Sequence, residues 1–225
     1  HGEYKRTTVE ESAEKYALGK FGLILGRTWE LMVNDDMDAF TRIPAQLGVR
    51  AREKENEIFW GLIIANAALA DSVAYFDNAH GNTGTGAIDV TNIGAGRAKM
   101  RVQTDLEGEI MSVQPRYLVV PAALETKAEQ FTASIQPQAG SDVNPFAGKL
   151  VPVVEPRLDA ASTAQWYLGA DKAQLAAAEM ALLDGRGPEI FVREGFEVDG
   201  MELKLRYVFG MKLIDFRAMY RSSGS

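Results

Sequence analysis

The sequence contains no cysteine among its 225 residues. Disulfide bonds, thiolate metal sites and cysteine nucleophiles are therefore excluded. Positive charge is also in the minority, because 24 lysines and arginines stand against 31 aspartates and glutamates, for a formal net charge of −7. Such a balance disfavours a broad nucleic-acid-binding surface, since contacts to phosphates need an excess of positive charge.

Long hydrophobic runs are missing as well. The longest, FWGLIIANAALA at residues 59–70, is too short to span a bilayer and contains Asn66. No secretory signal opens the chain, and the first residue is His1, so we expect a processed product, a fragment or a tagged protein. Hydrophobic residues make up 46% of the sequence and charged residues 24%, a mixture typical of a globular protein with a real core.

Histidine is scarce, and the only one away from the terminus lies in FDNAHGNTGTG, residues 76–86. Asp77, His80 and Asn82 of this stretch are candidate metal ligands or acid–base groups. No HExxH or HxH pattern supplies further ligands, and no GxSxG marks a serine nucleophile. GNTGTG lacks the lysine of a phosphate-binding loop. We therefore predict a polar connecting loop with no catalytic residue, cofactor or metal; the alternative is a metal-dependent hydrolase using Asp77 and His80.

Residues 37–66 carry the strongest helical pattern. A helical region is expected from about Thr28, with Asn34, Asp35 and Asp36 capping the segment that follows. Pro44 weakens the first half, as does Gly48, so we expect a kink or break there.

The second half of this segment is predicted to be a long helix with one buried face, formed by Ala51, Ile58, Leu62 and Ala65. Opposite charges pair at three-residue spacing on its solvated side: Arg50 with Glu53, Arg52 with Glu55, and Lys54 with Glu57.

Strand-forming patterns lie at both ends of the chain. Residues 15–26, KYALGKFGLILG, are interrupted by glycines and predict an arm followed by an exposed hairpin or ribbon that packs outside its own domain. Near the other end, Met201, Leu203, Leu205, Tyr207 and Phe209 alternate with Glu202, Lys204 and Arg206. Asp199-Gly200 predicts a tight hairpin, and Gly210 a reversal or bulge. With helices expected at 93–108 and 122–135 and strands at 115–121, 149–158 and 164–170, the fold class is α+β.

Four stretches resemble, in the same order, the major head proteins of the Mu-like branch of tailed phages. They are LMVNDDMDAFTRIPAQLGVRAREKENEIFWGLI (31–63), YFDNAHGN (75–82), PRYLVVPAALETKAEQ (115–130) and GFEVDGMELKLRYVFGMKLIDFRAMY (195–220). The resemblance implies the Hong Kong 97-like capsid fold. In that fold an N-terminal arm and an extended E-loop hairpin reach neighbouring subunits, a peripheral domain holds a long spine helix and an antiparallel sheet, and an axial domain surrounds the symmetry axes.

On this resemblance the arm and E-loop would occupy residues 1–27 and the peripheral domain with its spine helix residues 28–86. The axial domain would follow at 87–185, and the closing strands of the peripheral domain at 186–225. The side chains expected to touch a neighbouring subunit are Tyr16, Leu18, Phe21 and Leu23.

The function implied by the resemblance is that of a major capsid protein, not an enzyme. It would self-assemble through hexamers and pentamers into an icosahedral head shell that encloses double-stranded DNA without sequence-specific binding. The implied partners are further copies of the chain and portal, scaffold or prohead protease, and decoration proteins, with no membrane. The protein would be part of the virion and be assembled in the bacterial host cytoplasm. An encapsulin-like nanocompartment shell is the alternative within the same fold.

Overall fold

A computed structural model describes residues 14–28, 38–133, 144, 146–195 and 200–225. The chain divides into two compact units. We call the first the four-stranded unit; it comprises Tyr16–Leu62 and Glu179–Lys212. The second, the five-stranded unit, contains Ile63–Ala178 and Leu213–Ser225, together with the N-terminal residues up to Lys15. The boundaries between these units follow Leu62, Ala178 and Lys212, whereas the resemblance placed domain boundaries after residues 86 and 185.

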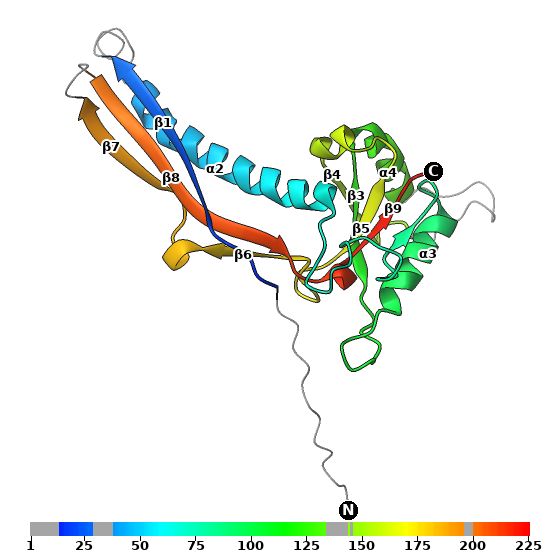
Figure 1. Ribbon diagram of the computed structural model, residues 1–225. Coiled ribbons are helices and arrows are strands. Elements are labelled where there is room, and N and C mark those ends of the chain that lie inside the picture. The colour runs from blue at the N-terminus through cyan, green and yellow to red at the C-terminus, as the bar shows by residue number, and fades with distance from the viewer. Residues whose placement is uncertain (1–13, 29–37, 134–143, 145, 196–199) are drawn as a thin grey trace, which may run out of the picture. The chain divides into compact units, whose positions relative to one another are not determined.

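The four-stranded unit is a sheet built around one long central strand (Figure 1). Strand β8 (Gly200–Leu213) pairs antiparallel with β1 (Gly19–Thr28) along one side. Along its other side lie β7 (Glu189–Gly195), which is antiparallel to it, and β6 (Ala178–Leu182). A short 3-10 helix, η4 (Leu183–Gly185), follows β6, and helix α2 (Asp38–Ala65) packs on the sheet.

The core of this unit lies between α2 and β8. Leu203, Leu205, Tyr207 and Phe209 are buried and contact a buried row on the helix, Ile43, Leu47 and Ala51. The predicted alternation of β8 is thus confirmed, because residues at every second position of a strand point to one face. Full burial of a leucine or phenylalanine side chain contributes about 1.5–3 kcal/mol, so this row is the main stabilising feature of the unit.

Helix α2 differs from the prediction in three places. It runs without a break through Pro44, because Ile43 and Leu47 on either side of the proline are held against the sheet, which offsets its cost of about 3 kcal/mol. Ala65, predicted to be buried, is exposed. Thr28, the expected start of a helical region, ends strand β1 instead, and the expected cap at residues 34–36 lies outside the described residues.

Two of the three predicted charge pairs on α2 form. Arg50 lies 3.3 Å from Glu53, and the Lys54 ammonium lies 2.8 Å from the Glu57 carboxylate. Glu55 has a different partner, because its Oε1 accepts a hydrogen bond of 2.6 Å from the Tyr207 hydroxyl. This contact fastens the helix to the central strand.

Replacing Tyr207 with phenylalanine is expected to lower the free energy of unfolding by about 1 kcal/mol, the usual net value of one hydrogen bond. Burial and the contact with Glu55 raise the pKa of the Tyr207 phenol above its ordinary value. A raised pKa means that the wild type keeps this stabilisation up to about pH 10 and loses it as the pH rises further. Urea denaturation at pH 7 and above pH 10 measures both effects.

The control for this change is Tyr117→Phe, since the Tyr117 hydroxyl makes no hydrogen bond with the described residues. Equal losses of stability in the two variants would contradict the assigned role of the Glu55 contact.

The strand predictions at the chain ends are partly confirmed. Gly195 pairs with Gly200, so β7 and β8 form a hairpin. The tight turn predicted at Asp199-Gly200 is wrong, because Gly200 is already the first residue of β8. The expected reversal at Gly210 is wrong, because β8 continues to Leu213. A glycine is needed there for another reason: a Cβ atom would come within 2.6 Å of the Ala17 carbonyl oxygen.

The N-terminal hairpin is also corrected. Within residues 14–28 the structure has one strand, β1, and its partner along all ten residues is β8 of the same chain. The apolar positions of this segment alternate in step with those of β8, so an intrachain ladder pairs the backbone groups on one side of β1 and covers part of its side chains.

The five-stranded unit is a mixed sheet in the order β2-β9-β5-β3-β4. Its strands are β2 (Thr83–Gly84), β3 (Pro115–Val120), β4 (Val151–Val154), β5 (Trp166–Ala170) and β9 (Met219–Ser222). Its helices are α3 (Val90–Arg101), α4 (Glu125–Thr132) and the 3-10 turns η1 (Ala122–Leu124), η3 (Pro156–Ala160) and η5 (Phe216–Ala218). Trp166, Leu168, Leu118 and Ile93 lie in its core.

The sequence predicted most of these elements. Strands at 115–121 and 164–170 and the helix after Pro121 are confirmed, the helix beginning with a 3-10 turn. The helix expected at 93–108 ends at Arg101, where a narrow hairpin bridged by Thr104 and Ile110 begins. The C-terminal residues were expected to close one sheet, but β9 lies between β2 and β5, in the five-stranded sheet.

Candidate functional site

The polar loop at residues 76–86 is held together by Asn82, a side chain that is only 1% exposed. Its Nδ2 donates to the carbonyl oxygens of Tyr75 at 2.8 Å and Phe216 at 3.1 Å. Its Oδ1 accepts from the backbone N–H of Asp77 at 3.1 Å. One amide group therefore satisfies three buried backbone groups and joins the loop to η5.

His80 is buried and fully engaged. Its ring stacks on Phe216 with centroids 3.8 Å apart and planes 4° apart. Nε2 lies 2.8 Å from Oδ2 of Asp71, and Nδ1 lies 3.2 Å from the Tyr75 carbonyl oxygen. Burial raises the pKa of the Asp71 carboxyl, but hydrogen bonds from the Val73 amide and from His80 outweigh it, and the pKa is lowered. Because a protein oxygen lies within hydrogen-bond distance of each ring nitrogen, neither nitrogen is directed at a ligand.

Asp77, which the hydrolase alternative places beside His80, makes no hydrogen bond to it. Its carboxylate accepts instead from the backbone N–H of Ala79 at 2.8 Å, which closes a local turn. The true partner, Asp71, precedes the motif by several residues, and no sequence signal pointed to it.

Two glycines of the loop adopt backbone conformations that other residues rarely adopt. Gly81 and Gly86 have positive φ values of 65° and 102°, which favour glycine. The Gly86 carbonyl oxygen accepts from Trp166 Nε1 at 2.9 Å and Ser222 Oγ at 2.8 Å. Thr83 and Gly84 form β2 beside β9. These bonds fasten the loop to β5 and β9.

Within the described residues, no group of three or more histidines, aspartates and glutamates is placed to hold a metal ion. In the same part of the chain, no helix has the length and apolarity needed to cross a bilayer.

Replacing His80 with alanine is expected to lower the free energy of unfolding by about 2 kcal/mol, because a buried ring and its hydrogen bonds are lost. Chemical denaturation measures the loss. Metal analysis of wild type and variant tests the hydrolase alternative at the same time, since that alternative requires a stoichiometric metal that disappears with the imidazole.

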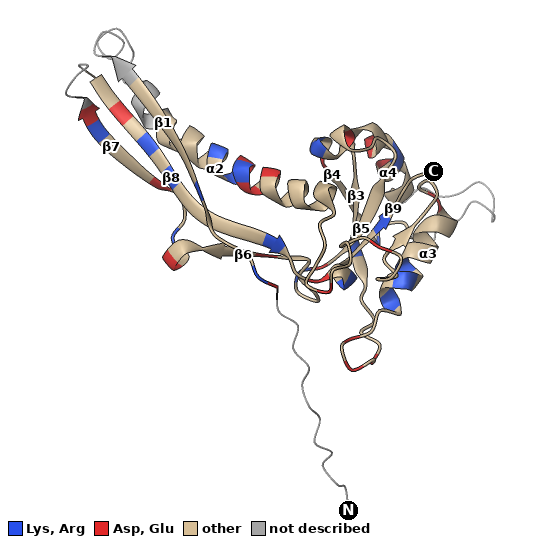
Figure 2. Cartoon of the chain, viewed as in Figure 1, with Lys and Arg blue, Asp and Glu red and all other residues tan. Residues whose placement is uncertain are grey.

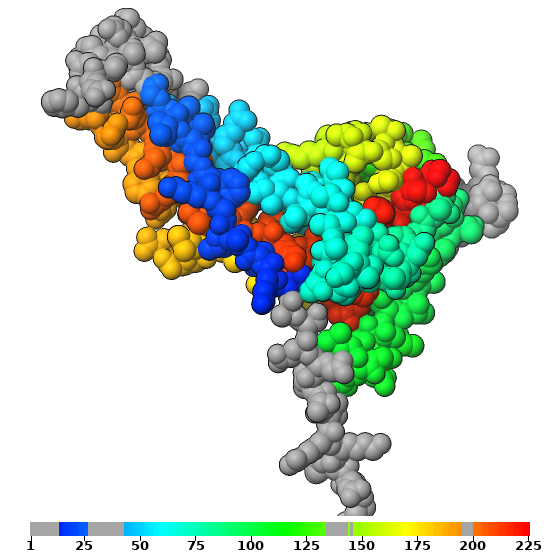
Figure 3. Space-filling view, in the orientation of Figure 1, coloured from blue at the N-terminus to red at the C-terminus, as the bar shows by residue number. Residues whose placement is uncertain are grey.

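Exposed apolar side chains concentrate in the four-stranded unit. Ten of the sixteen exposed large hydrophobic side chains in the described residues belong to it. They are Leu18, Leu23, Ile24, Leu25, Val49, Met180, Leu183, Ile190, Phe191 and Val192. The strand β1, which holds three of them, lies at the surface in Figure 3. A surface of this kind is typical of a protein that binds other proteins.

The four side chains predicted to contact a neighbour fall into two pairs. Leu18 and Leu23 are each 41% exposed and available. Phe21 packs within its own chain, with its ring 4.8 Å from that of Phe209. Tyr16 is half-buried, and burial together with nearby Glu179 raises the pKa of its phenol.

The exposed residues that follow Leu23 and those on β7 were not predicted from the sequence. A signal was present, because residues 23–25 (LIL) and 190–192 (IFV) are apolar at three consecutive positions. A strand covered on one face needs apolar residues only at alternate positions.

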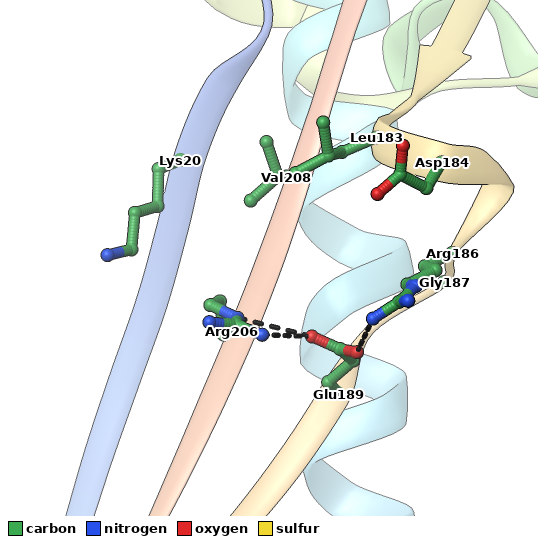
Figure 4. Close-up of a pocket in the computed structure, with 8 residues that line it drawn as sticks. All are labelled: Lys20, Leu183, Asp184, Arg186, Gly187, Glu189, Arg206 and Val208. Atoms are coloured by element: carbon green, nitrogen blue, oxygen red, sulfur yellow. Dashed lines mark hydrogen bonds and ion pairs between the residues drawn. The ribbon is translucent and has the colours of Figure 1, made fainter.

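Figure 2 shows charged residues along β7 and β8. They alternate with Leu203 and Leu205, which face α2, so their side chains lie on the opposite face of the sheet. There a cavity of about 390 Å³ is lined by Lys20, Leu183, Asp184, Arg186, Gly187, Glu189, Arg206 and Val208. Glu189 accepts from Arg206 at 2.6 Å and lies 3.5 Å from Arg186 (Figure 4). The hydrogen bond from Arg206 lowers the pKa of Glu189. The pair of Glu189 and Arg206 joins β7 to β8.

The chain is similar to known shell proteins. A family model described as phage capsid protein matches residues 11–222. The capsid protein of Myoviridae phage XM1 is 11% identical, with a TM-score of 0.61 over 92% of this chain and 74% of that chain. A structure from Mycobacterium phage Che8 is 12% identical, with a TM-score of 0.56 over 92% and 71%.

The encapsulin of Synechococcus elongatus PCC 7942 has a TM-score of 0.53 at 9% identity, over 92% of this chain and 74% of that one. At these identities the structural likeness shows the fold alone. No curated protein matches the sequence. The family model, however, covers nearly the whole chain, so the chain belongs to the phage capsid protein family.

Proposed function

We propose that this chain is the major head subunit of a tailed phage of the Mu-like branch. It self-assembles through hexamers and pentamers into an icosahedral shell around double-stranded DNA. Family membership implies a structural protein of the virion. The observation that carries the proposal is the concentration of exposed apolar side chains on the four-stranded unit, a surface that a second copy would cover.

The layout of the Hong Kong 97-like fold is part of the proposal. Helix α2 is 28 residues long and packs on an antiparallel sheet, as expected of a spine helix and its peripheral domain. The five-stranded unit would then act as the axial domain. The N-terminal arm, together with Leu18 and Leu23 of the exposed surface, would touch neighbouring subunits. Portal, scaffold or prohead protease, and decoration proteins remain proposed partners, and assembly would take place in the host cytoplasm.

Electron microscopy of the purified protein tests the proposal. We expect closed shells, or rings of five and six subunits, at micromolar concentration. If the protein stays monomeric at the highest soluble concentration, the proposal is wrong. Assembly should also respond to salt and crowding agents, because association buries apolar surface.

An encapsulin-like shell is the second candidate, favoured by the likeness to the Synechococcus elongatus encapsulin. The content of shells isolated from the native host separates the two. Nuclease-protected double-stranded DNA supports a phage head, whereas a single enriched enzyme inside DNA-free shells supports a nanocompartment.

A further inference from the structure

Two exposed apolar triplets lie at the same level on opposite edges of the four-stranded sheet. On β1, residues 23–25 are 41%, 62% and 39% exposed, and on β7, residues 190–192 are 37%, 40% and 60% exposed. Leu205 of β8 is opposite Leu23 on one side and Ile190 on the other. In the same way, Ile24 and Phe191 both pair with Lys204. Leu25 and Val192 both pair with Leu203.

Strands β1 and β7 are the two edges of the sheet at this level, because β8 between them pairs with both. Along β1 the ladder with β8 is regular over ten residues and contains no proline. In the part of the chain that the structure describes, no strand pairs with the other side of β1. A long, regular, apolar edge is a ready template for another strand.

The five-stranded sheet has an edge strand, β4, of a different kind. Its edge strand β4 has four residues and contains Pro152, which has no N–H to donate. The edge strand β4 is thus protected by its short length and its proline, whereas β1 is ten residues long and has no proline. The contrast favours a partner for β1 over an accidental exposure.

The geometry of the sheet identifies the partner as a second copy. Both β1 and β7 run antiparallel to β8, so they run parallel to each other. A second copy placed alongside in the same orientation brings its β7 against β1, at the same level. Leu23 and Leu25 point to the face covered by α2, as do Ile190 and Val192, so apolar side chains meet on that face.

We propose that β1 of one copy pairs edge to edge with β7 of a second copy, so that residues 23–25 and 190–192 cover each other. This inference rests on the proposed function, since the partner is another shell subunit. The contact joins two different surfaces, so it leaves one free edge at each end and can be repeated around a ring. Pairing of β1 with another β1 would leave the triplet on β7 uncovered.

A charge-swap experiment tests the pairing. Leu25→Glu and Val192→Lys each place a charge in the apolar contact, and each is expected to raise the concentration for half-assembly about tenfold or more. The double variant carries Glu on one edge and Lys on the other. Assembly should return to within about threefold of wild type, because each contact now joins opposite charges. Val102→Lys, at a 63% exposed valine of the five-stranded unit, is the control and should assemble normally.

Sedimentation velocity measures assembly, and circular dichroism verifies that each variant is folded. Single variants that assemble like wild type, or a double variant that assembles no better than the singles, would overturn the pairing. The second result is what a β1–β1 contact predicts, since the lysine on β7 would then lie outside the contact and could not compensate the glutamate. If the wild type assembles, these failures leave the proposed function standing; a monomeric wild type overturns both.

Hydrogen exchange on the wild-type chain gives a readout that needs no variant. Backbone amides in residues 19–28 and 189–195 should exchange at least about tenfold more slowly in the assembled state than in the dissociated subunit, because new ladder hydrogen bonds form. Amides of helix α3 serve as the internal reference. Unchanged exchange at both edges would contradict the inference.

Discussion

Replacing Phe209 with alanine is expected to lower the free energy of unfolding by about 4 kcal/mol, near the upper end for a buried aromatic side chain. Phe209 lies on β8, and its side chain is fully buried in the core between this strand and α2. Its ring lies 4.5 Å from that of Tyr207 and 4.8 Å from that of Phe21. Truncation removes both ring contacts and leaves a cavity, and the surrounding strands and helix can close it only in part.

The matched control is Phe191→Ala on the edge strand β7. Phe191 is 40% exposed, and its ring lies below the Lys204 ammonium and the Arg206 guanidinium. Its loss is expected to cost about 1 kcal/mol, since solvent already reaches the ring. Urea denaturation of dissociated subunits compares the two variants, because assembly would add to apparent stability. Equal losses would show that the helix–sheet core is not the main stabilising feature.

Replacing Asn82 with alanine is expected to lower the free energy of unfolding by about 3 kcal/mol, because buried backbone groups lose their partners. The carbonyl of Phe216 and the N–H of Asp77 would be left without the amide, and the Tyr75 carbonyl would keep only its longer contact to His80. Asn82→Asp should be at least as harmful, because a carboxylate cannot donate to two carbonyl oxygens.

Asn78→Ala is the control for Asn82. Asn78 lies in the same loop but is exposed, and it accepts one hydrogen bond from the Thr83 hydroxyl. We expect a loss below about 1 kcal/mol there. Denaturation followed by Trp fluorescence suits this comparison, since Trp166 is bonded to the same loop through Gly86. A harmless Asn82→Ala change would mean that water replaces the amide and that the loop is not tied down as described.

The sequence predicted the elements whose patterns are local. The alternation of β8, the length of α2 and the strands around Trp166 and Tyr117 were all legible from spacing. What failed was decided by packing across the chain. Pro44 remains inside a helix because its neighbours are buried, and the N-terminal ribbon became a single strand because β8 offers a matching partner about 190 residues away.

The functional residues divide in the same way. His80 and Asn82 were noticed because rare polar residues stand out, yet their partners, Asp71 and the Phe216 carbonyl, come from outside the motif. The exposed edges were missed because exposure depends on which strand lies in the middle. The consecutive apolar residues on β1 and β7 can be recognised as exposed edges only when β8 is known to lie between these two strands.

The order of strands has a consequence for synthesis. The central strand of one sheet is β8, and the other sheet needs β9 between β2 and β5; both strands follow their partners late in the chain. Gly19 of β1 can pair only after Phe209 has been synthesised, and Thr83 of β2 only after Arg221. During translation neither sheet can close until the ribosome has made nearly all of its residues, and such distant pairings form slowly. Until β8 has been made, β1 therefore lacks the strand that pairs with it in the folded subunit, so its apolar side chains have no intrachain cover during that time.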